Sequence, residues 1–185
     1  MRKPLLGLAL VLVLALGASG FLAGAALLIR AYVVEPFVVP TGAMAPTIQS
    51  GDRILAWKRP FTPERGDVVV FRSLADPHVN YVKRVAAVAG ETVEFRADGV
   101  YIDDSRVADG ALGRMAYVAL TVSPGAPQWA REGEPFQVPP GHVFLVGDNL
   151  QNSLDSRLFG PVPVGNIVGK AYRRYWPLDR SGPIE

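Results

Sequence analysis

The sequence of 185 residues contains no cysteine and only two histidines. Without cysteine, thiolate catalysis and cysteine zinc sites are excluded, and an exported domain of this size can fold without disulfides. The two histidines, His78 and His142, stand too far apart from other candidate ligands to predict a zinc site or a histidine-based triad. We therefore expect no metal ion and no cofactor.

Long blocks of one charge are also missing. The formal net charge is +2, with an isoelectric point near 9.0, but the basic residues are scattered and Arg173-Arg174 is the only dense group. A nucleic-acid-binding protein would concentrate its positive charge on one face or segment. We therefore expect no nucleic-acid partner, and the excess charge predicts only a weak attraction to anionic lipid headgroups.

The amino-terminal segment carries an uncharged apolar run from Pro4 to Ile29. A helix of about 20 apolar residues crosses the hydrocarbon core of a bilayer, so this run predicts a single transmembrane anchor. The alternative is a cleaved signal peptide, which the small residues Ala18-Ser19-Gly20 would suit. The apolar region of a signal peptide is usually only about 7 to 15 residues long, which favours the uncleaved anchor.

Charges at the two ends of the anchor predict its orientation. Arg2 and Lys3 form a short basic tail, and such tails normally stay in the cytoplasm. The prediction is a cytoplasmic tail and anchor over residues 1–30, followed by one extracytoplasmic domain over residues 31–185.

Beyond Arg30 the pattern changes to short β-like runs separated by turn residues. The sequence has 19 glycines and 16 prolines, which can form such turns. The pattern predicts a mainly β domain. Predicted strands cover Ala31–Val39, Arg53–Trp57, Asp67–Phe71, Val79–Val88, Thr92–Phe95, Val100–Ile102, Ala116–Val122, His142–Val146 and Ile167–Tyr175.

Two features refine this prediction. Asp98-Gly99 lies between two apolar runs and predicts a hairpin with a type I′ turn, whose two central residues both need positive φ. Residues 103–140 are rich in glycine and proline, and we expect a loop-rich insertion there with one strand inside it. No pattern predicts a helix longer than one or two turns in the domain.

Three segments carry unusual combinations of polar and turn residues. The first, Val39 to Asp52, reads V-P-T-G-A-M-A-P-T-I-Q-S-G-D, and its prolines and glycines predict a turn with exposed backbone amides. The second is Tyr81-Val82-Lys83-Arg84-Val85, followed by Gly90-Glu91. The third, Gly147 to Gly160, reads G-D-N-L-Q-N-S-L-D-S-R-L-F-G.

These segments, in this order behind an apolar run, resemble three motifs of the bacterial type I signal peptidases. The family patterns are P-S-x-S-M-x-P-T-L-x-x-G-D, K-R-V-x-x-x-x-G-D and G-D-N-x-x-x-S-x-D-S-R-x-x-G. The first pattern matches at Pro40, Met44, Pro46, Thr47, Gly51 and Asp52. The resemblance implies a membrane-anchored serine/lysine endopeptidase that removes signal peptides from exported preproteins at the bacterial cytoplasmic membrane.

The resemblance also implies a role for individual residues. The family's nucleophile is the second serine of the first motif, and this chain has Ala43 there. Thr41 matches the first serine and would help the backbone N–H of residue 43 to hold the oxyanion, although it could instead cap its own turn. Lys83 corresponds to the general base. Because the nucleophile is missing, we expect this chain to bind signal peptides without cleaving them.

The local pattern supports the role of Lys83. Side chains alternate along a strand, so Lys83 shares one face with Tyr81 and Val85 and has mostly apolar neighbours. A lysine acts as a base near neutral pH only when burial disfavours its charged form. We therefore expect Lys83 to be buried.

The third motif implies supporting residues. By resemblance, Ser153 aims the Lys83 amine, Asp155 and Arg157 form an ion pair, and Asp148 joins that pair because one guanidinium can hold two carboxylates. The family accepts small residues at two alternate positions before the cut, and the predicted walls of these pockets include Phe37, Val39, Met44 and Tyr81. Signal peptides and membrane lipid are the expected partners, with the protein translocation machinery as a further one.

Several readings of Ala43 compete. Because Lys83 and Ser153 are intact, we favour a deliberate serine-to-alanine replacement over a natural pseudoprotease that binds signal peptides. A self-cleaving relative of the LexA type would need a DNA-binding helix-turn-helix where this chain has its apolar run. A shifted nucleophile at Thr41 or Ser50 would lie two or seven residues from the position that the motif assigns.

Overall fold

The computed structural model describes residues 15–24, 33–58, 60–115 and 127–185. Residues 15–24 form a helix. Within the described residues, no helix combines the length and apolar character needed to cross a membrane. The rest of the predicted tail and anchor, residues 1–14 and 25–30, lies outside the described residues.

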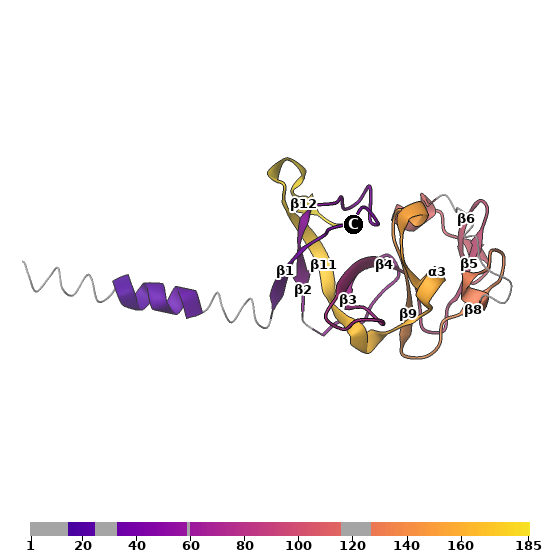
Figure 1. The fold of residues 1–185 in the computed structure, drawn as a ribbon, viewed down its shortest axis with the longest axis horizontal. Helices are drawn as coiled ribbons and strands as arrows, with labels where there is room; N and C mark the ends of the chain where they lie inside the picture. The colour runs from indigo at the N-terminus through magenta and orange to yellow at the C-terminus, as the bar shows by residue number, and fades with distance from the viewer. Residues whose placement is uncertain (1–14, 25–32, 59, 116–126) are drawn as a thin grey trace, which may run out of the picture.

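Two antiparallel sheets make up the domain (Figure 1). The larger one has the order β1 (Val34–Val38), β2 (Arg53–Trp57), β11 (Ile167–Trp176), β3 (Val68–Arg72), β4 (Asn80–Val88), β9 (His142–Val146) and β10 (Val162–Pro163), with β12 (Gly182–Pro183) beside β11. The smaller one has the order β7 (Ser105–Arg106), β6 (Gly99–Ile102), β5 (Thr92–Arg96) and β8 (Phe136–Gln137).

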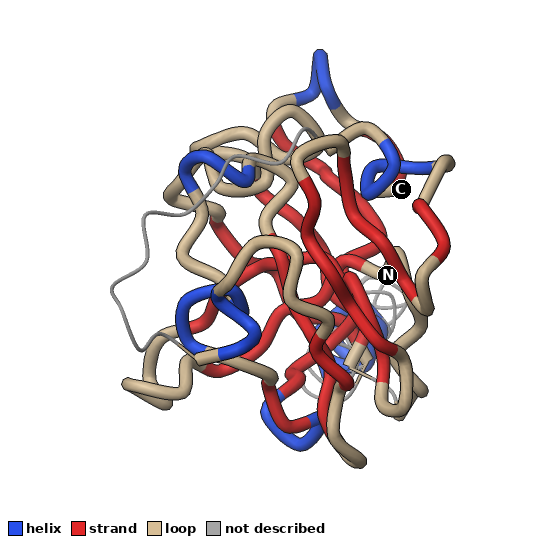
Figure 2. The backbone as a smooth tube through the Cα atoms, turned by 90° about the vertical axis from the view of Figure 1, so that its right-hand side faces the viewer, coloured by secondary structure: helices blue, strands red, loops and turns tan. Residues whose placement is uncertain are grey.

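The helices of the domain are single turns around the strands (Figure 2). They are α2 (Gly110–Gly113), η1 (Gln128–Ala130), η2 (Leu150–Asn152), α3 (Ser156–Phe159), η3 (Val164–Asn166) and η4 (Leu178–Arg180). The mainly β prediction is thus confirmed.

The long predicted strands agree closely with the structure. Arg53–Trp57 and His142–Val146 have the predicted bounds, and the other long strands differ by one residue at an end, except that β1 begins at Val34, three residues after the predicted start at Ala31. The strand predicted at Ala116–Val122 lies outside the described residues. The two-residue strands β7, β8, β10 and β12 were not predicted, because two residues are too few to show an alternating pattern.

The predicted hairpin forms between β5 and β6, but the prediction of its turn is wrong. Arg96 pairs with Gly99, so residues 97–98 form the loop, and neither has positive φ. The two adjacent residues with positive φ are Asp103 (49°) and Asp104 (62°), between β6 and β7. Aspartate tolerates this conformation better than most residues, which lets the type I′ pattern occur one hairpin later.

The larger sheet is packed on both faces, as its central strand β3 illustrates. Val68 and Val70 belong to one buried cluster with Ile48 and Ile54, while Val69 and Phe71 belong to another cluster on the opposite face. A strand covered on both faces reads as a continuous apolar run. The neighbouring strand β4, which carries Lys83, is therefore held in the middle of a packed sheet.

Candidate active site

Position 43 lies in the loop between β1 and β2, residues 39–52. The two ends of this loop are tied together, because the N–H of Val39 donates to Asp52 O (2.9 Å) and the N–H of Gly51 donates to Val39 O (2.8 Å). Met44 and Ile48 anchor the loop from inside, since both side chains are buried in the core cluster. Ala43, beside Met44, is 6% exposed.

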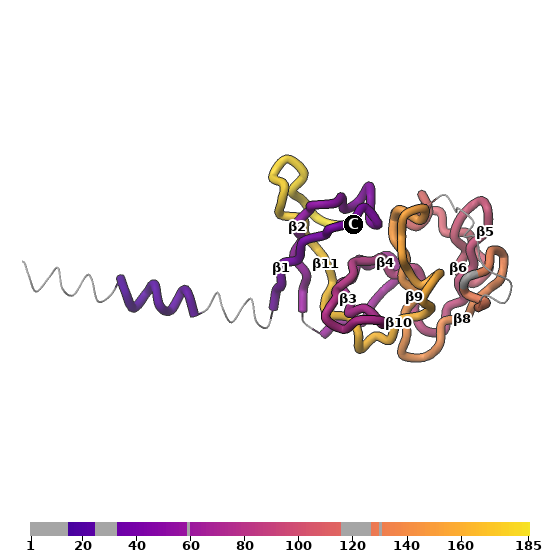
Figure 3. The backbone as a smooth tube through the Cα atoms, viewed as in Figure 1, coloured from indigo at the N-terminus to yellow at the C-terminus, as the bar shows by residue number. Residues whose placement is uncertain are grey.

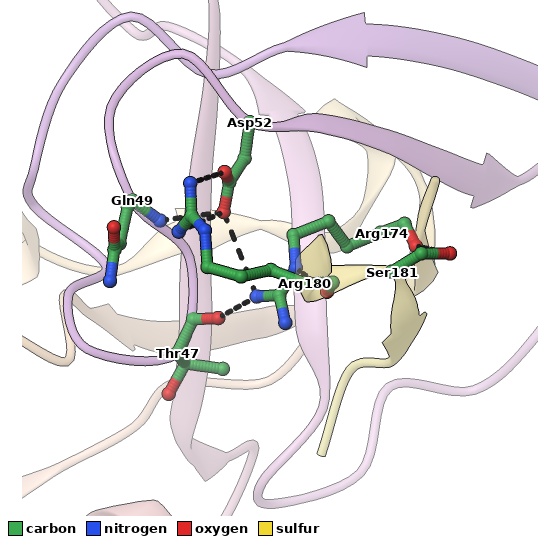
Figure 4. Close-up of polar contacts among 6 residues, drawn as sticks. All are labelled: Thr47, Gln49, Asp52, Arg174, Arg180 and Ser181. Atoms are coloured by element: carbon green, nitrogen blue, oxygen red, sulfur yellow. Dashed lines mark hydrogen bonds and ion pairs between the residues drawn. The ribbon is translucent and has the colours of Figure 1, made fainter. Parts of the chain in front are cut away.

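A buried carboxylate clamps this loop to the carboxy-terminal part of the chain (Figure 4). Asp52 is fully buried and accepts from the N–H of Gln49 (2.9 Å) and from Arg180 Nη2 (2.7 Å). Arg174 lies 3.6 Å from Asp52 Oδ2 and donates to the carbonyl of Thr47 (2.7 Å). The guanidinium of Arg174 is thus engaged within the protein.

The loop after β9 lies beside the loop of residues 39–52, which is distant from it in the sequence (Figure 3). The N–H of Asn149 donates to Ala43 O (3.0 Å), and its side chain donates to Gly42 O (3.3 Å). A Cβ on Gly147 would lie 2.4 Å from Ala43 O and 2.3 Å from Ser153 Oγ. Only glycine permits this close approach, which brings the first and third motifs together.

Lys83 on β4 is 4% exposed, so the expectation that it is buried is confirmed. Its Nζ lies 5.9 Å from the centre of the Tyr81 ring and has no hydrogen bond or ion pair among the described residues. Burial lowers the pKa of Lys83 below its ordinary value of 10.5, while the negative charges of Asp155 and Asp148 partly oppose that decrease. Burial thus shifts the Lys83 amine toward its neutral form.

Two separate buried ion pairs support this region. Asp155 Oδ1 lies 2.9 Å from Arg157 Nε, and Arg157 also donates to the carbonyl of Leu150 (2.7 Å). Asp148 forms a bidentate pair with Arg84, with both contacts at 2.7 Å. The prediction that Asp148 joins the pair of Asp155 and Arg157 is therefore wrong.

Two cavities meet at Lys83. The first, of about 300 Å³, is lined by the end of β1 and the start of β4 and includes all four predicted substrate-binding residues, Phe37, Val39, Met44 and Tyr81. The second, of about 460 Å³, is lined by residues that include Ala43 and Ser153. The residues shared by both cavities are Thr41, Tyr81 and Lys83.

A family model described as "Signal peptidase, peptidase S26" matches residues 11–176 of the chain. The chain belongs to the signal peptidase S26 family. Members of this family are serine peptidases, and relatives of this chain occur in bacteria and in plant organelles.

Three relatives illustrate the match. A signal peptidase I of Pseudomonas fluorescens is 34% identical over 194 residues, covering 82% of this chain and 68% of the relative. Thylakoidal processing peptidase 1 of Arabidopsis thaliana is 35% identical over 165 residues, covering 82% of this chain and 44% of the relative. A crystal structure of a signal peptidase I from Enterococcus faecalis V583 is 29% identical, with a TM-score of 0.46, and covers 60% of this chain and 98% of that one.

The hydroxyl groups around the signal peptidase site differ in accessibility. Thr41 is exposed at the junction of the two cavities, and its hydroxyl has no hydrogen bond among the described residues. Ser153 Oγ is buried and likewise has no hydrogen-bond partner in the described part of the chain. Ser50 donates to Pro40 O (2.8 Å) and lines neither cavity, which counts against Ser50 as a shifted nucleophile.

Sequence reasoning missed three arginines that hold this site together. Arg84 belongs to the second motif but received no role, and its partner Asp148 lies 64 positions away. Arg174 and Arg180 reach Asp52 across more than 100 positions. The sequence offered one signal for these contacts, Asp52 at the end of the first motif, because a buried carboxylate needs a positively charged partner.

The lowered pKa of Lys83 predicts how its removal changes stability. Protonating a buried lysine costs free energy, so Lys83→Met is expected to raise the free energy of unfolding at neutral pH. Between the lowered folded-state pKa and the unfolded value of about 10.4, the unfolded chain binds more protons, so the wild type gains stability as pH rises. Urea unfolding should therefore show that Lys83→Met raises the free energy of unfolding by its largest amount below the folded-state pKa of Lys83. This gain should disappear above the unfolded-state pKa.

Leu178→Met is the control for this measurement, because Leu178 is 73% exposed and does not titrate. Its effect on stability should change little across the same pH window. A stabilisation by Lys83→Met that stays constant up to pH 11 would contradict the lowered pKa.

Proposed function

We propose that the chain binds the signal peptides of exported preproteins in the 300 Å³ cavity and leaves them uncut. One observation carries this proposal: a buried lysine without an ion pair or hydrogen bond among the described residues lies between two cavities, next to residue 43. A lysine in such a place has little structural use, and it suits a general base. An extended peptide would add along the end of β1, with small side chains entering the apolar cavity.

The proposed roles follow the family motifs. With serine at position 43, neutral Lys83 would take the hydroxyl proton while Oγ attacks the carbonyl carbon of the scissile bond. The lysine would then give that proton to the leaving amine as the C–N bond breaks, and water would hydrolyse the resulting acyl-enzyme. Thr41 and the backbone N–H of residue 43 would stabilise the oxyanion, and Ser153 would aim the lysine amine. Asp155 with Arg157, and Asp148 with Arg84, would hold the loop that carries Ser153. The methyl group of Ala43 cannot attack, so the bound peptide stays whole.

The proposed location is the bacterial cytoplasmic membrane. Residues 1–30 would provide a cytoplasmic tail and one membrane-spanning anchor, and residues 31–185 the extracytoplasmic domain. The uncharged run from Pro4 to Ile29 supports this arrangement. Lipid and the protein translocation machinery are the further proposed partners, because signal peptides emerge at the membrane surface.

The origin of Ala43 is tested by the native gene. Intact Lys83 and Ser153 favour a replaced serine, because a long-inactive protein has no catalytic reason to keep them. We expect a serine codon at position 43 in the native gene. A genomic alanine codon would instead identify a natural pseudoprotease that binds signal peptides.

Peptide binding tests the proposed function directly. A fluorescent signal peptide ending at its cut site should bind the detergent-solubilised full chain and remain whole by mass spectrometry. Val79 lines the first cavity, so Val79→Trp should fill part of it and weaken binding by at least about tenfold. Leu178→Trp, at an exposed residue outside both cavities, is the matched control. Equal affinities for the two variants and the wild type would contradict the proposal.

A further inference from the structure

The proposed function assigns the signal peptide to the first cavity and leaves the second cavity without an occupant. Its volume of about 460 Å³ exceeds that of the first cavity, and its lining includes Gln151, Asn152, Leu154 and Leu158 in addition to the three shared residues. Among the described residues, Lys83 is the one charged side chain in its lining. It therefore offers an uncharged, partly apolar surface directly beside position 43.

Two leucines on this surface are unusually exposed. Leu154 is 52% exposed and Leu158 is 49% exposed. Large apolar side chains that gather at a cavity commonly mark a binding surface. Both lie close to the buried ion pair of Asp155 and Arg157, on a segment that this pair fixes.

The local backbone holds these leucines in place. Asp155 caps α3 by accepting from the N–H of Arg157 (3.2 Å), and the N–H of Leu158 donates to Asp155 O (2.8 Å). Gly160 at the end of α3 packs against Trp129 of η1, where an added Cβ would lie 3.2 Å from the indole ring. The surface is therefore preformed, which lowers the entropy lost when a ligand binds.

The position of Ala43 indicates which part of a bound peptide would enter the second cavity. Ala43 lines the second cavity and does not line the first. If the residues before the cut occupy the first cavity, the carbonyl to be cleaved lies at position 43, and the chain that follows continues past Lys83 into the second cavity. The two cavities then form one path for a peptide that crosses the site.

We propose that the second cavity binds the first residues of the mature protein, those immediately after the cut, and that Leu154 and Leu158 favour apolar side chains there. This inference rests on the proposed function and adds a second determinant of specificity to it. Residues on both sides of the cut would then contribute to preprotein selection.

Three peptides test this inference on the full chain with Ala43, which leaves each of them whole. The first ends at the cut site with an amidated carboxyl terminus, the second continues with Ala-Leu-Ala-Leu, and the third continues with Ala-Ser-Ala-Ser. The leucine extension should bind about tenfold tighter than the truncated peptide, and the serine extension should gain much less, because burial of leucine provides the added affinity.

The double variant Leu154→Ser with Leu158→Ser should lose this tenfold gain and keep the wild-type affinity for the truncated peptide, which also shows that it is folded. Leu74→Ser with Leu178→Ser, at exposed leucines outside both cavities, is the matched control and should keep the gain. Equal binding of all three peptides by the wild type, or a gain that persists in the double variant, would overturn the inference. Failure of the truncated peptide to bind would instead contradict the proposed function.

Discussion

Ala43→Ser is expected to turn the chain into an active endopeptidase, with turnover rising by about a million-fold, the loss typical of deleting a catalytic serine. The substitution adds one oxygen to a residue that already lines the cavity containing Lys83. The pKa of Lys83 is lowered by burial, so a larger share of the amine is neutral and ready to accept the serine proton.

The measurement is cleavage of a purified precursor by the detergent-solubilised Ala43→Ser protein, followed by gel and mass spectrometry. Cleavage should occur at the end of the signal peptide. Ala43→Ser combined with Lys83→Met is the matched control and should bind the precursor without cutting it. A serine variant that binds the precursor and leaves it whole would contradict the proposed serine/lysine chemistry.

The pH dependence of the rate of the same serine variant reports the lowered pKa of Lys83. Asp148 and Asp155 raise the pKa of Lys83, and burial outweighs them. The rate of the serine variant should therefore rise with pH until the lysine is neutral, and it should reach its plateau at a pH below the ordinary lysine value.

Features set by local pattern were predictable from the sequence. The apolar neighbours of Lys83 predicted its burial, and short apolar runs predicted β2 and β9 with their observed bounds. The meeting of Ala43 with Gly147 and Asn149 followed only from resemblance, because hydrogen bonds between loops about 100 residues apart leave no periodic signal.

The arginine contacts were beyond local reasoning for a different reason. Arg84 and Arg157 each lie within a family motif, yet they form ion pairs with different aspartates. Arg84 pairs with Asp148, and Arg157 pairs with Asp155. That choice depends on which strands are neighbours in the sheet, since β4 and β9 pair through Arg84 and Val146, next to the loop with Asp148. Sheet order is a property of the whole fold, so it could not be read from one segment.

The buried pair of Asp155 and Arg157 should dominate the stability of the site. Arg157→Met is expected to lower the free energy of unfolding by about 3–5 kcal/mol, because it leaves the carboxylate of Asp155 buried without its counter-charge. Urea unfolding followed by tryptophan fluorescence measures this loss. Arg65→Met breaks a half-exposed ion pair with Glu91 and should cost less than about 1 kcal/mol.

A second substitution separates the loss of a contact from the burial of an unpaired charge. Asp155→Asn with Arg157→Met removes both charges and keeps a side-chain oxygen that can accept from the N–H of Gly147, as Asp155 does at 3.1 Å. The double variant should therefore be more stable than Arg157→Met alone, because no charge remains unpaired in the interior. A double variant that is less stable than Arg157→Met would show that the carboxylate itself holds the loop. The hydrogen bonds that it accepts from the backbone N–H groups of residues 147 and 157 would then outweigh the cost of burying its charge.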